Sequence, residues 1–220
     1  MGDRNREIPT VIFLDAVGTL FGVQGSVGQI YGEMARQFGV EVPAAELNRA
    51  FYQSFRAAGA PAFPNTLAAE IQEQEYIWWK NVVIATFNQL GKLQQFQDFD
   101  SFFAQLYAYF ATASPWFIYP DVLPALQRWR AFDVQLGILS NFDSRVYAVL
   151  DALNLSHFFS SVTISTEVGA AKPDAKIFQV ALQKHLCEPG RTWHIGDRFD
   201  EDYQAACAFG MRGIWLHRKA

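Results

Sequence analysis

Hydrophobic residues recur at two different spacings along the chain, and the change of spacing divides the chain into parts. Residues Thr10–Leu14 form a short continuous run rich in β-branched side chains, which is typical of a strand buried on both faces. From there to about residue 114 the spacing is helical, and it predicts helices over 26–38, 43–58, 66–90 and 100–112. Ser26, with Gln29 three places later, is expected to cap the first of these helices.

The rest of the chain alternates between strand-like and helical segments. The pattern predicts strands over 134–139, 161–165, 192–195 and 213–216, with helices over 121–131, 144–153, 174–186 and 200–209. This alternation is typical of an α/β protein with a Rossmann-like parallel sheet, here interrupted by an inserted all-helical cap domain. We place the core in residues 1–22 and 117–220 and the cap in residues 23–116, with Gly22, Gly25 and Gly28 as hinge residues.

The composition narrows the class of protein further. A chain of 220 residues, half of them hydrophobic, can bury one core and a smaller companion. A net charge of -4, with Lys and Arg scattered singly, argues against nucleic acid or an anionic membrane as partner. No apolar segment approaches the ~20 residues of a membrane span, and residues 1–10 lack the apolar run of a signal peptide. We therefore expect a cytoplasmic protein, in which Cys187 and Cys207 are reduced and buried.

Polar residues stand at the carboxyl ends of the predicted strands. Asp15 follows the first strand, Ser140 and Asn141 follow the second, Asp197 follows the fourth, and Lys172 precedes the helix after the third. In a parallel sheet, ligands bind at this edge. Each of these residues alone could be a turn or a helix cap. Together, two acids, a hydroxyl and a lysine are suited to hold a divalent cation and a phosphoryl group.

These residues belong to four short motifs that occur in order along the chain. They are the DxxGTL stretch that begins at Asp15, the pair Ser140-Asn141, the triplet Lys172-Pro173-Asp174, and the pair Gly196-Asp197 with Asp202 five positions beyond Asp197. The set resembles the motifs of the haloacid dehalogenase superfamily, and the helical insert after the first motif resembles the C1 cap of that superfamily. The resemblance covers nearly the whole chain. It implies a hydrolase, with a Mg²⁺-dependent phosphatase of a small phosphorylated metabolite as the best-fitting activity.

The resemblance also implies roles for single residues. Asp15 would be the nucleophile that attacks phosphorus and forms an aspartyl-phosphate, since a carboxylate beside a cation can act in this way. Ser140 and Lys172 would bind the transferring phosphoryl group, and Asn141 would contact the phosphate or the leaving group. Thr19 would orient the surroundings of the nucleophile.

The metal site that the resemblance implies is built from oxygen ligands, as Mg²⁺ prefers. Asp15 and Asp197 would hold the ion together with the backbone carbonyl of Val17. Asp202 would serve either as a further ligand or as the support of one.

Val17 is where the chain departs from the pattern of the superfamily. Its phosphatases have a second Asp at this position, which protonates the leaving group and then activates water, and Val17 can do neither. General acid–base catalysis contributes typically 10²–10⁴-fold to a rate, so we expect slow turnover of poor leaving groups. Asp143 and Asp200 are candidates to replace the missing acid.

Three other functions stay open beside the phosphatase. A binding or regulatory protein that has lost turnover would need the same phosphate and metal ligands. A 2-haloacid dehalogenase also lacks the second Asp, but that subfamily lacks the Gly-Asp pair, and we find no arginine placed early in the cap to receive a halide. A phosphonatase uses a cap lysine, whereas the first half of this cap contains only Arg36, Arg49 and Arg56, and Lys80 lies late.

Several other residues near the motifs have simpler interpretations. His194 lies in a buried strand pattern and is expected to be a hydrogen-bonded core residue. The cap aromatics Tyr76, Trp78 and Trp79 are expected to pack between helices. Arg198 and Phe199 either reach the site or form its solvated rim. The oligomeric state stays open, because the aromatic-rich cap could pack on a second copy or close on the core.

Overall fold

A parallel sheet of five strands, in the order β5-β4-β1-β6-β7, forms the centre of the computed structural model, which describes residues 8–218. The central strand β1 (Val11–Leu14) pairs with β4 (Gln135–Ser140) on one side and β6 (Thr192–Gly196) on the other. The outer strands are β5 (Ser161–Ile164) and β7 (Arg212–Trp215). The three central strands therefore end side by side at one edge of the sheet.

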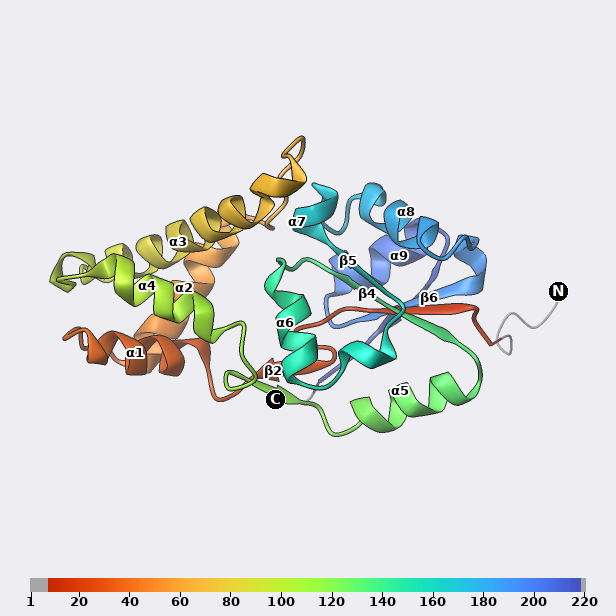
Figure 1. Ribbon diagram of the computed structural model, residues 1–220, viewed down its shortest axis with the longest axis horizontal. Coiled ribbons are helices and arrows are strands. Elements are labelled where there is room, and N and C mark those ends of the chain that lie inside the picture. The colour runs from red at the N-terminus through yellow and green to blue at the C-terminus, as the bar shows by residue number, and fades with distance from the viewer. Residues whose placement is uncertain (1–7, 219–220) are drawn as a thin grey trace.

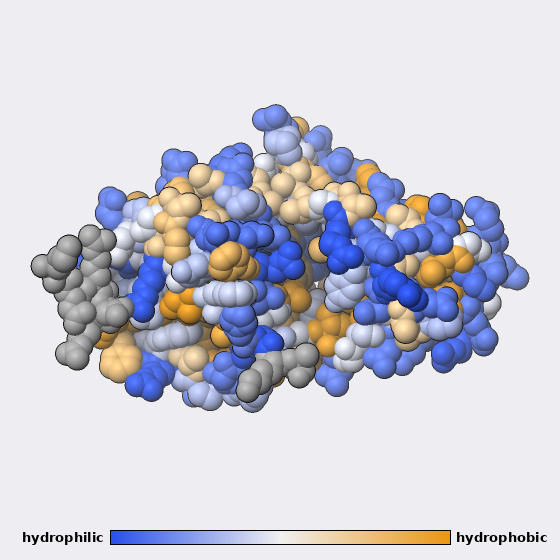
Figure 2. All heavy atoms as spheres, turned by 180° about the vertical axis from the view of Figure 1, so that it is seen from behind, coloured by the Kyte–Doolittle hydropathy of each residue, from blue (hydrophilic) through white to orange (hydrophobic). Residues whose placement is uncertain are grey.

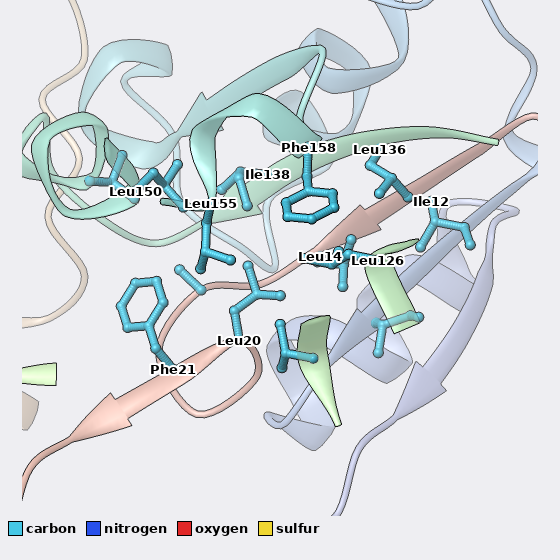
Figure 3. Packing of buried hydrophobic residues seen from close by; sticks show 14 of the residues in the cluster. Ile12, Leu14, Leu20, Phe21, Leu126, Leu136, Ile138, Leu150, Leu155 and Phe158 are labelled. Atoms are coloured by element: carbon cyan, nitrogen blue, oxygen red, sulfur yellow. The ribbon is translucent and has the colours of Figure 1, made fainter. Parts of the chain in front are cut away.

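Helices cover both faces of this sheet (Figure 1). On one face, α5 (Val122–Ala131) and α6 (Arg145–Ala152) pack over Ile12 and Leu14; Figure 3 shows this cluster. On the other face, α8 (Ala175–Gln183) and α9 (Ala205–Ala208) pack over Val11 and Phe13. Because successive side chains of a strand point to opposite faces, all four residues of β1 are buried. The predicted α/β class is confirmed.

The long insert after β1 folds into helices with an apolar core of their own. Its helices are α1 (Val27–Gln37), α2 (Ala44–Ala58), α3 (Ile71–Gln89) and α4 (Phe99–Tyr109), and they lie beyond one end of the sheet (Figure 1). The core of this cap is rich in aromatic rings, and Phe87 and Phe102 are fully buried in it. Ser26 caps α1 as predicted, since its side chain accepts a hydrogen bond from the Gln29 N–H.

Two short strands are not predicted from the sequence. β2 (Phe21–Val23) and β3 (Trp116–Ile118) pair antiparallel, one on each of the two connections between sheet and cap. Strands of three residues are too short to show an alternating pattern, so the sequence does not reveal them. The predicted domain boundaries fall within this ribbon, and they stay predictions.

The proposed hinge glycines differ in their surroundings. Gly25 has a φ of +69° and lies in the turn before α1, whereas Gly22 lies within β2. Gly28 lies inside α1, where a Cβ atom would be 2.1 Å from the backbone oxygen of Ala44. Gly28 therefore lets α1 and α2 pack closely, and its expected role as a hinge residue stays a prediction.

The remaining differences from the sequence predictions are local. The predicted helix 200–209 is a π-helical segment, η5 (Phe199–Gln204), followed by the short α9. Further short elements are η1 (Ala68–Glu70), η2 (Leu93–Gln95), η3 (Ser156–Phe158), α7 (Ser165–Val168) and η4 (Pro189–Arg191). Cys187 and Cys207 are free thiols as expected, but Cys187 is only partly buried and Cys207 is exposed. The inward face of α9 is formed by Ala205 and Ala206, which leaves Cys207 outside.

The surface matches the expected globular character. On the face seen in Figure 2, hydrophilic residues dominate and hydrophobic residues form scattered spots. Within residues 8–218, every helix is either too short or too polar to cross a membrane. The expectation that residues 1–10 lack the apolar run of a signal peptide rests in part on residues 1–7, which lie outside the described part of the chain.

Candidate active site

Asp15 lies directly after β1, at the carboxyl edge of the sheet, and two neighbours hold its carboxylate. The Ser140 hydroxyl, at the end of β4, donates to Asp15 Oδ1 at 2.8 Å. The Lys172 ammonium binds the same oxygen at 2.8 Å. Burial raises the pKa of Asp15, and the charge of Lys172 and both hydrogen bonds oppose that effect. The structure thus brings together the predicted nucleophile and the two predicted phosphate-binding side chains.

Lys172 is a buried cation between two carboxylates. Its Nζ donates to Asp15, to Asp202 Oδ1 and to the Leu139 carbonyl at 3.0 Å. Burial alone would lower the pKa of Lys172, but Asp15 and Asp202 raise it above its usual value, so the side chain stays charged. Asn141 holds the backbone of this residue, because it accepts from the Lys172 N–H at 2.7 Å and donates to the Lys172 carbonyl at 2.9 Å. Contact of Asn141 with a substrate stays a prediction.

A cluster of three carboxylates stands beside Lys172. Asp15, Asp197 and Asp202 each offer an oxygen, and these oxygens lie within 4.8 Å of one another. Burial, followed by the charges of Asp15 and Asp202, raises the pKa of Asp197 to about 6. Asp197 Oδ1 is buried and finds no hydrogen-bond partner among the described residues. Carboxylate oxygens are the ligands that Mg²⁺ prefers, so the cluster fits the predicted metal.

Gly18 allows this cluster to form. Its φ is +87°, which favours glycine, and a Cβ atom there would be 2.5 Å from Asp197 Oδ2. The glycine of the DxxGTL motif is thus needed for the close approach of Asp197 to Asp15.

Asp202 differs from the other two carboxylates because both of its oxygens already accept hydrogen bonds. Oδ1 binds Lys172 and the His194 ring nitrogen Nε2, the latter at 3.0 Å, and Oδ2 accepts from the Arg198 N–H at 2.9 Å. Burial raises the pKa of Asp202, but Lys172 and His194 outweigh it and hold that pKa below its usual range. These contacts favour Asp202 as the support of Lys172 and of the Asp197 loop. A direct bond from Asp202 to the metal stays a prediction.

His194 is the hydrogen-bonded core residue that its strand pattern predicts. Its side chain is fully buried and bonded to Asp202, and burial lowers its pKa. The imidazole is therefore neutral near pH 7.

Val17 and Thr19 complete the first motif. Val17 lines the cavity above Asp15 and packs against the apolar cluster of Figure 3. The Thr19 hydroxyl is buried and makes no hydrogen bond within residues 8–218. Its predicted orienting role, and the predicted metal ligation by the Val17 carbonyl, stay predictions.

The two candidates for a replacement acid differ in position. Asp143 is buried and lines the cavity, but Arg145 binds both of its oxygens, with Nε at 2.8 Å from Oδ1 and Nη2 at 2.6 Å from Oδ2. Trp79 Nε1 also donates to Asp143 Oδ2, at 2.7 Å. Asp200 is exposed and is not among the residues that line the cavity. Neither carboxyl is therefore placed to donate a proton beside Asp15.

A cavity of about 460 Å³ opens over Asp15, between the core and the cap. Its floor carries Asp15, Ser140 and Asp197, and its walls are mainly aromatic and aliphatic side chains of the cap. Trp79 packs against Phe55 and Trp78 in the cap, as predicted, and it also lines the cavity. Tyr76 and Trp78 pack against other cap aromatics as predicted.

Other lining residues were not found from the sequence. They include Tyr31, Tyr107, Arg145 and Glu201. The cap arginine Arg56 also lines the cavity, which the sequence does not predict. Arg198 also lines the cavity, although its side chain is 67% exposed, and it therefore belongs to the rim. Helical spacing shows which positions share a face, but it does not show which face of a cap helix turns towards the core. No signal in the sequence singles these residues out.

Glu75, on the cap helix α3, joins the cap to the core. This fully buried carboxylate accepts from the Ser144 N–H at 2.9 Å, from the Ser144 hydroxyl, and from the Thr166 hydroxyl at 2.6 Å. Ser144 precedes α6 and Thr166 lies in α7, so one cap side chain ties two core segments. Burial raises the pKa of Glu75, and the hydrogen bonds from Ser144 and Thr166 oppose that shift.

We expect Glu75→Ala to lower the free energy of unfolding by about 1–3 kcal/mol, because it leaves donors at the partly buried Ser144 and the buried Thr166 without this partner. Glu73→Ala, on the exposed side of the same helix, is the matched control. Urea unfolding of both variants measures the difference. Equal stability of the two variants would contradict a structural role for the Glu75 contacts.

The fold and the site at the carboxyl edge of the sheet indicate a hydrolase, and the comparisons with known proteins agree with this class. This chain belongs to the haloacid dehalogenase-like hydrolases, because the model of that family matches residues 9–210, which contain all four motifs. The sequence-based assignment to this superfamily is confirmed.

This chain resembles known proteins both in sequence and in structure. It is 35% identical over 201 residues to the mouse haloacid dehalogenase-like hydrolase domain-containing protein 3, covering 91% of this chain and 78% of the mouse protein. A glyceraldehyde 3-phosphate phosphatase of Methanopyrus kandleri is 36% identical over 101 residues, which cover 46% of this chain and 43% of that protein.

Among solved structures, the L-2-haloacid dehalogenase PA0810 matches with a TM-score of 0.74 at 18% identity, covering 96% of this chain and 84% of that one. A phosphatase of this superfamily from Thermococcus onnurineus matches with a TM-score of 0.63 at 20% identity, covering 95% and 86%. At these identities the structural matches show the fold alone.

Proposed function

We propose that this protein is a Mg²⁺-dependent phosphatase of a small phosphorylated metabolite, acting in the cytoplasm through an aspartyl-phosphate on Asp15. One observation carries the proposal. One oxygen of the Asp15 carboxylate is held by Ser140 and Lys172, and a buried Asp197 oxygen that has no hydrogen-bond partner within residues 8–218 lies in the same cluster. This arrangement provides a nucleophile, phosphate-binding groups and metal ligands at one edge of the sheet.

The side chains suggest a displacement in two steps. An Asp15 oxygen attacks phosphorus and forms an acyl-phosphate as the bond from phosphorus to the leaving oxygen breaks and the leaving group departs, while the Lys172 charge and the Ser140 hydroxyl stabilise the phosphoryl oxygens. Water then attacks the same phosphorus, which releases phosphate and restores the carboxylate. Asp15, Asp197 and the Val17 carbonyl would hold Mg²⁺, which supplies positive charge against the repulsion between carboxylate and phosphate. The cavity between the core and the cap would limit the access of bulk water to these charges.

The alternatives receive less support from the site. The glyceraldehyde 3-phosphate phosphatase among the relatives favours phosphoryl chemistry. The carboxylate cluster favours a metal, which argues against the dehalogenase, and the cap lysine of a phosphonatase has no counterpart among the residues that line the cavity. A phosphate-binding protein without turnover is the second candidate, and Val17 is the residue that favours it.

Phosphate release from a panel of phosphate esters, measured with and without Mg²⁺, tests the proposal. Asp15→Asn serves as the blank, because an amide cannot form the acyl-phosphate. Mg²⁺-dependent release that disappears in the blank supports the phosphatase. Release equal to the blank across the panel would favour the binding protein.

Mg²⁺ should raise the melting temperature of the protein by mass action. A concentration ten times Kd stabilises by about 1.4 kcal/mol, which corresponds to roughly 3–6 °C for a chain of this size. Thermal scans with and without Mg²⁺ measure the shift. Asp197→Asn should lose it, whereas Asp200→Asn, at an exposed carboxylate outside the cluster, should keep it. An equal shift in both variants would contradict the metal site.

A further inference from the structure

The surroundings of Asp15 restrict the group that can leave from phosphorus. Val17, two residues after Asp15, lines the cavity and has no proton to donate. Apart from the metal-binding cluster, the carboxylates that line the cavity within the described residues 8–218 are Asp143 and Glu201. Asp143 is bound through both oxygens by Arg145 and also accepts from Trp79.

Glu201 is also engaged by its neighbours. Asn141 Nδ2 donates to Glu201 Oε2 at 3.2 Å, and Arg198 Nη2 lies 3.6 Å from Oε1. Both carboxylate oxygens of Glu201 thus already have a partner on a neighbouring side chain. Neither Asp143 nor Glu201 therefore has a carboxyl oxygen free to protonate a leaving group.

The cavity walls select for an apolar group. Most of the side chains that the cap contributes are apolar, among them Phe51, Phe55, Phe103, Leu106 and Phe110, and the ribbon contributes Trp116. The polar cap side chains in the wall are the tyrosines Tyr31, Tyr52 and Tyr107 and the exposed Arg56. Arg145, the buried cation of the wall, is already paired with Asp143, and its guanidinium lies over the Tyr107 ring at 4.0 Å. The hydroxyls of a sugar would lose their water against carbon, whereas an apolar group gains by burial there.

We propose that the substrate carries its phosphate on an apolar leaving group that is stable as an anion, such as a phenol, an enol or a carboxylic acid. This inference rests on the proposed phosphatase function. An Asp15 oxygen bonds to phosphorus as the bond to the leaving oxygen breaks, and the electron pair stays on that oxygen. The anion takes a proton from solvent after release. Water then attacks the aspartyl-phosphate, its protons pass to phosphate and solvent, and the Asp15 carboxylate returns.

Phenyl phosphate and benzyl phosphate test this proposal, because they are similar in size and polarity. They differ in the leaving group: phenoxide is a weak base, since phenols have pKa values of roughly 10, whereas benzyl alkoxide is a strong one. We expect kcat/KM for phenyl phosphate to exceed that for benzyl phosphate by about 10²–10⁴, the usual worth of a general acid. Glycerol phosphate, which is polar and leaves as an alkoxide, should be hydrolysed more slowly than either.

Variants at position 17 separate protonation from packing. Val17→Asp should narrow the gap between the two esters by accelerating benzyl phosphate, whereas Val17→Asn, of the same size but without an acid, should keep the gap. Thermal scans of both variants test whether they fold.

The possible outcomes distinguish this inference from the function on which it rests. Equal kcat/KM for phenyl and benzyl phosphate, or a preference for glycerol phosphate, would overturn the inference and leave an Asp15-dependent phosphatase in place. If phenyl and benzyl phosphate have equal kcat/KM in the wild type and unequal kcat/KM in Glu201→Gln, Glu201 is the acid, and the inference is overturned as well. Release no greater than the Asp15→Asn blank from every ester would overturn the phosphatase and the inference together.

Discussion

Asp15→Asn is expected to lower kcat for phosphate release by at least about 10³-fold, because the variant lacks the carboxylate that attacks phosphorus. Loss of a catalytic nucleophile in other hydrolases has effects of this order or larger. The amide oxygen can still accept the hydrogen bond of Ser140 and a contact from Lys172, so the local geometry should persist. Steady-state kinetics on phenyl phosphate measures the effect.

The control for Asp15→Asn is a measurement of its melting temperature without Mg²⁺. This temperature should lie well above the assay temperature, so that the assayed sample is fully folded. A folded Asp15→Asn protein that keeps more than a tenth of the wild-type kcat would contradict the role of Asp15 as nucleophile.

Lys172→Met is expected to lower the free energy of unfolding by about 3–5 kcal/mol, the typical result of removing one partner from a buried ion pair. Lys172 is 3% exposed and contacts both Asp15 and Asp202, so its loss leaves two carboxylates facing each other without a cation. The melting temperature should fall by roughly 6–20 °C. Urea unfolding without Mg²⁺ measures the change.

Two further variants show whether charge is the cause. Lys176→Met removes an exposed lysine of α8 and should have little effect. Adding Asp202→Asn to Lys172→Met should recover part of the lost stability, because one of the two uncompensated carboxylates is gone. A double variant no more stable than Lys172→Met alone would contradict an electrostatic cause.

The sequence predicts the core of this fold well because its strands are buried on both faces. Short continuous apolar runs such as Val11–Leu14 are typical of strands in a parallel sheet, and parallel strands end at one edge. That rule is sufficient to predict that Asp15, Ser140 and Asp197 lie together. The structure confirms their neighbourhood and adds the contacts of Lys172 with Asp15 and Asp202.

The cap is where the sequence carries less information. Helix α3 carries apolar residues both on its buried half, with Val82 and Phe87, and on its exposed side, with Ile77, so its apolar pattern does not identify the face that turns to the core. Glu75 looks like a surface residue in the sequence, because its partners Ser144 and Thr166 lie far along the chain. For the same reason, neither the Asp143–Arg145 pair nor the cavity-facing position of Trp79 could be predicted.

Detection of a phosphoryl group on Asp15 tests the central claim most directly. The protein is mixed with phenyl phosphate and Mg²⁺, quenched in acid within one turnover, digested, and analysed by mass spectrometry. We predict one added phosphoryl group on the peptide that contains Asp15, removable by hydroxylamine and absent in Asp15→Asn. Phosphate release at the wild-type rate with no phosphorylated peptide at any quench time would contradict covalent catalysis by Asp15.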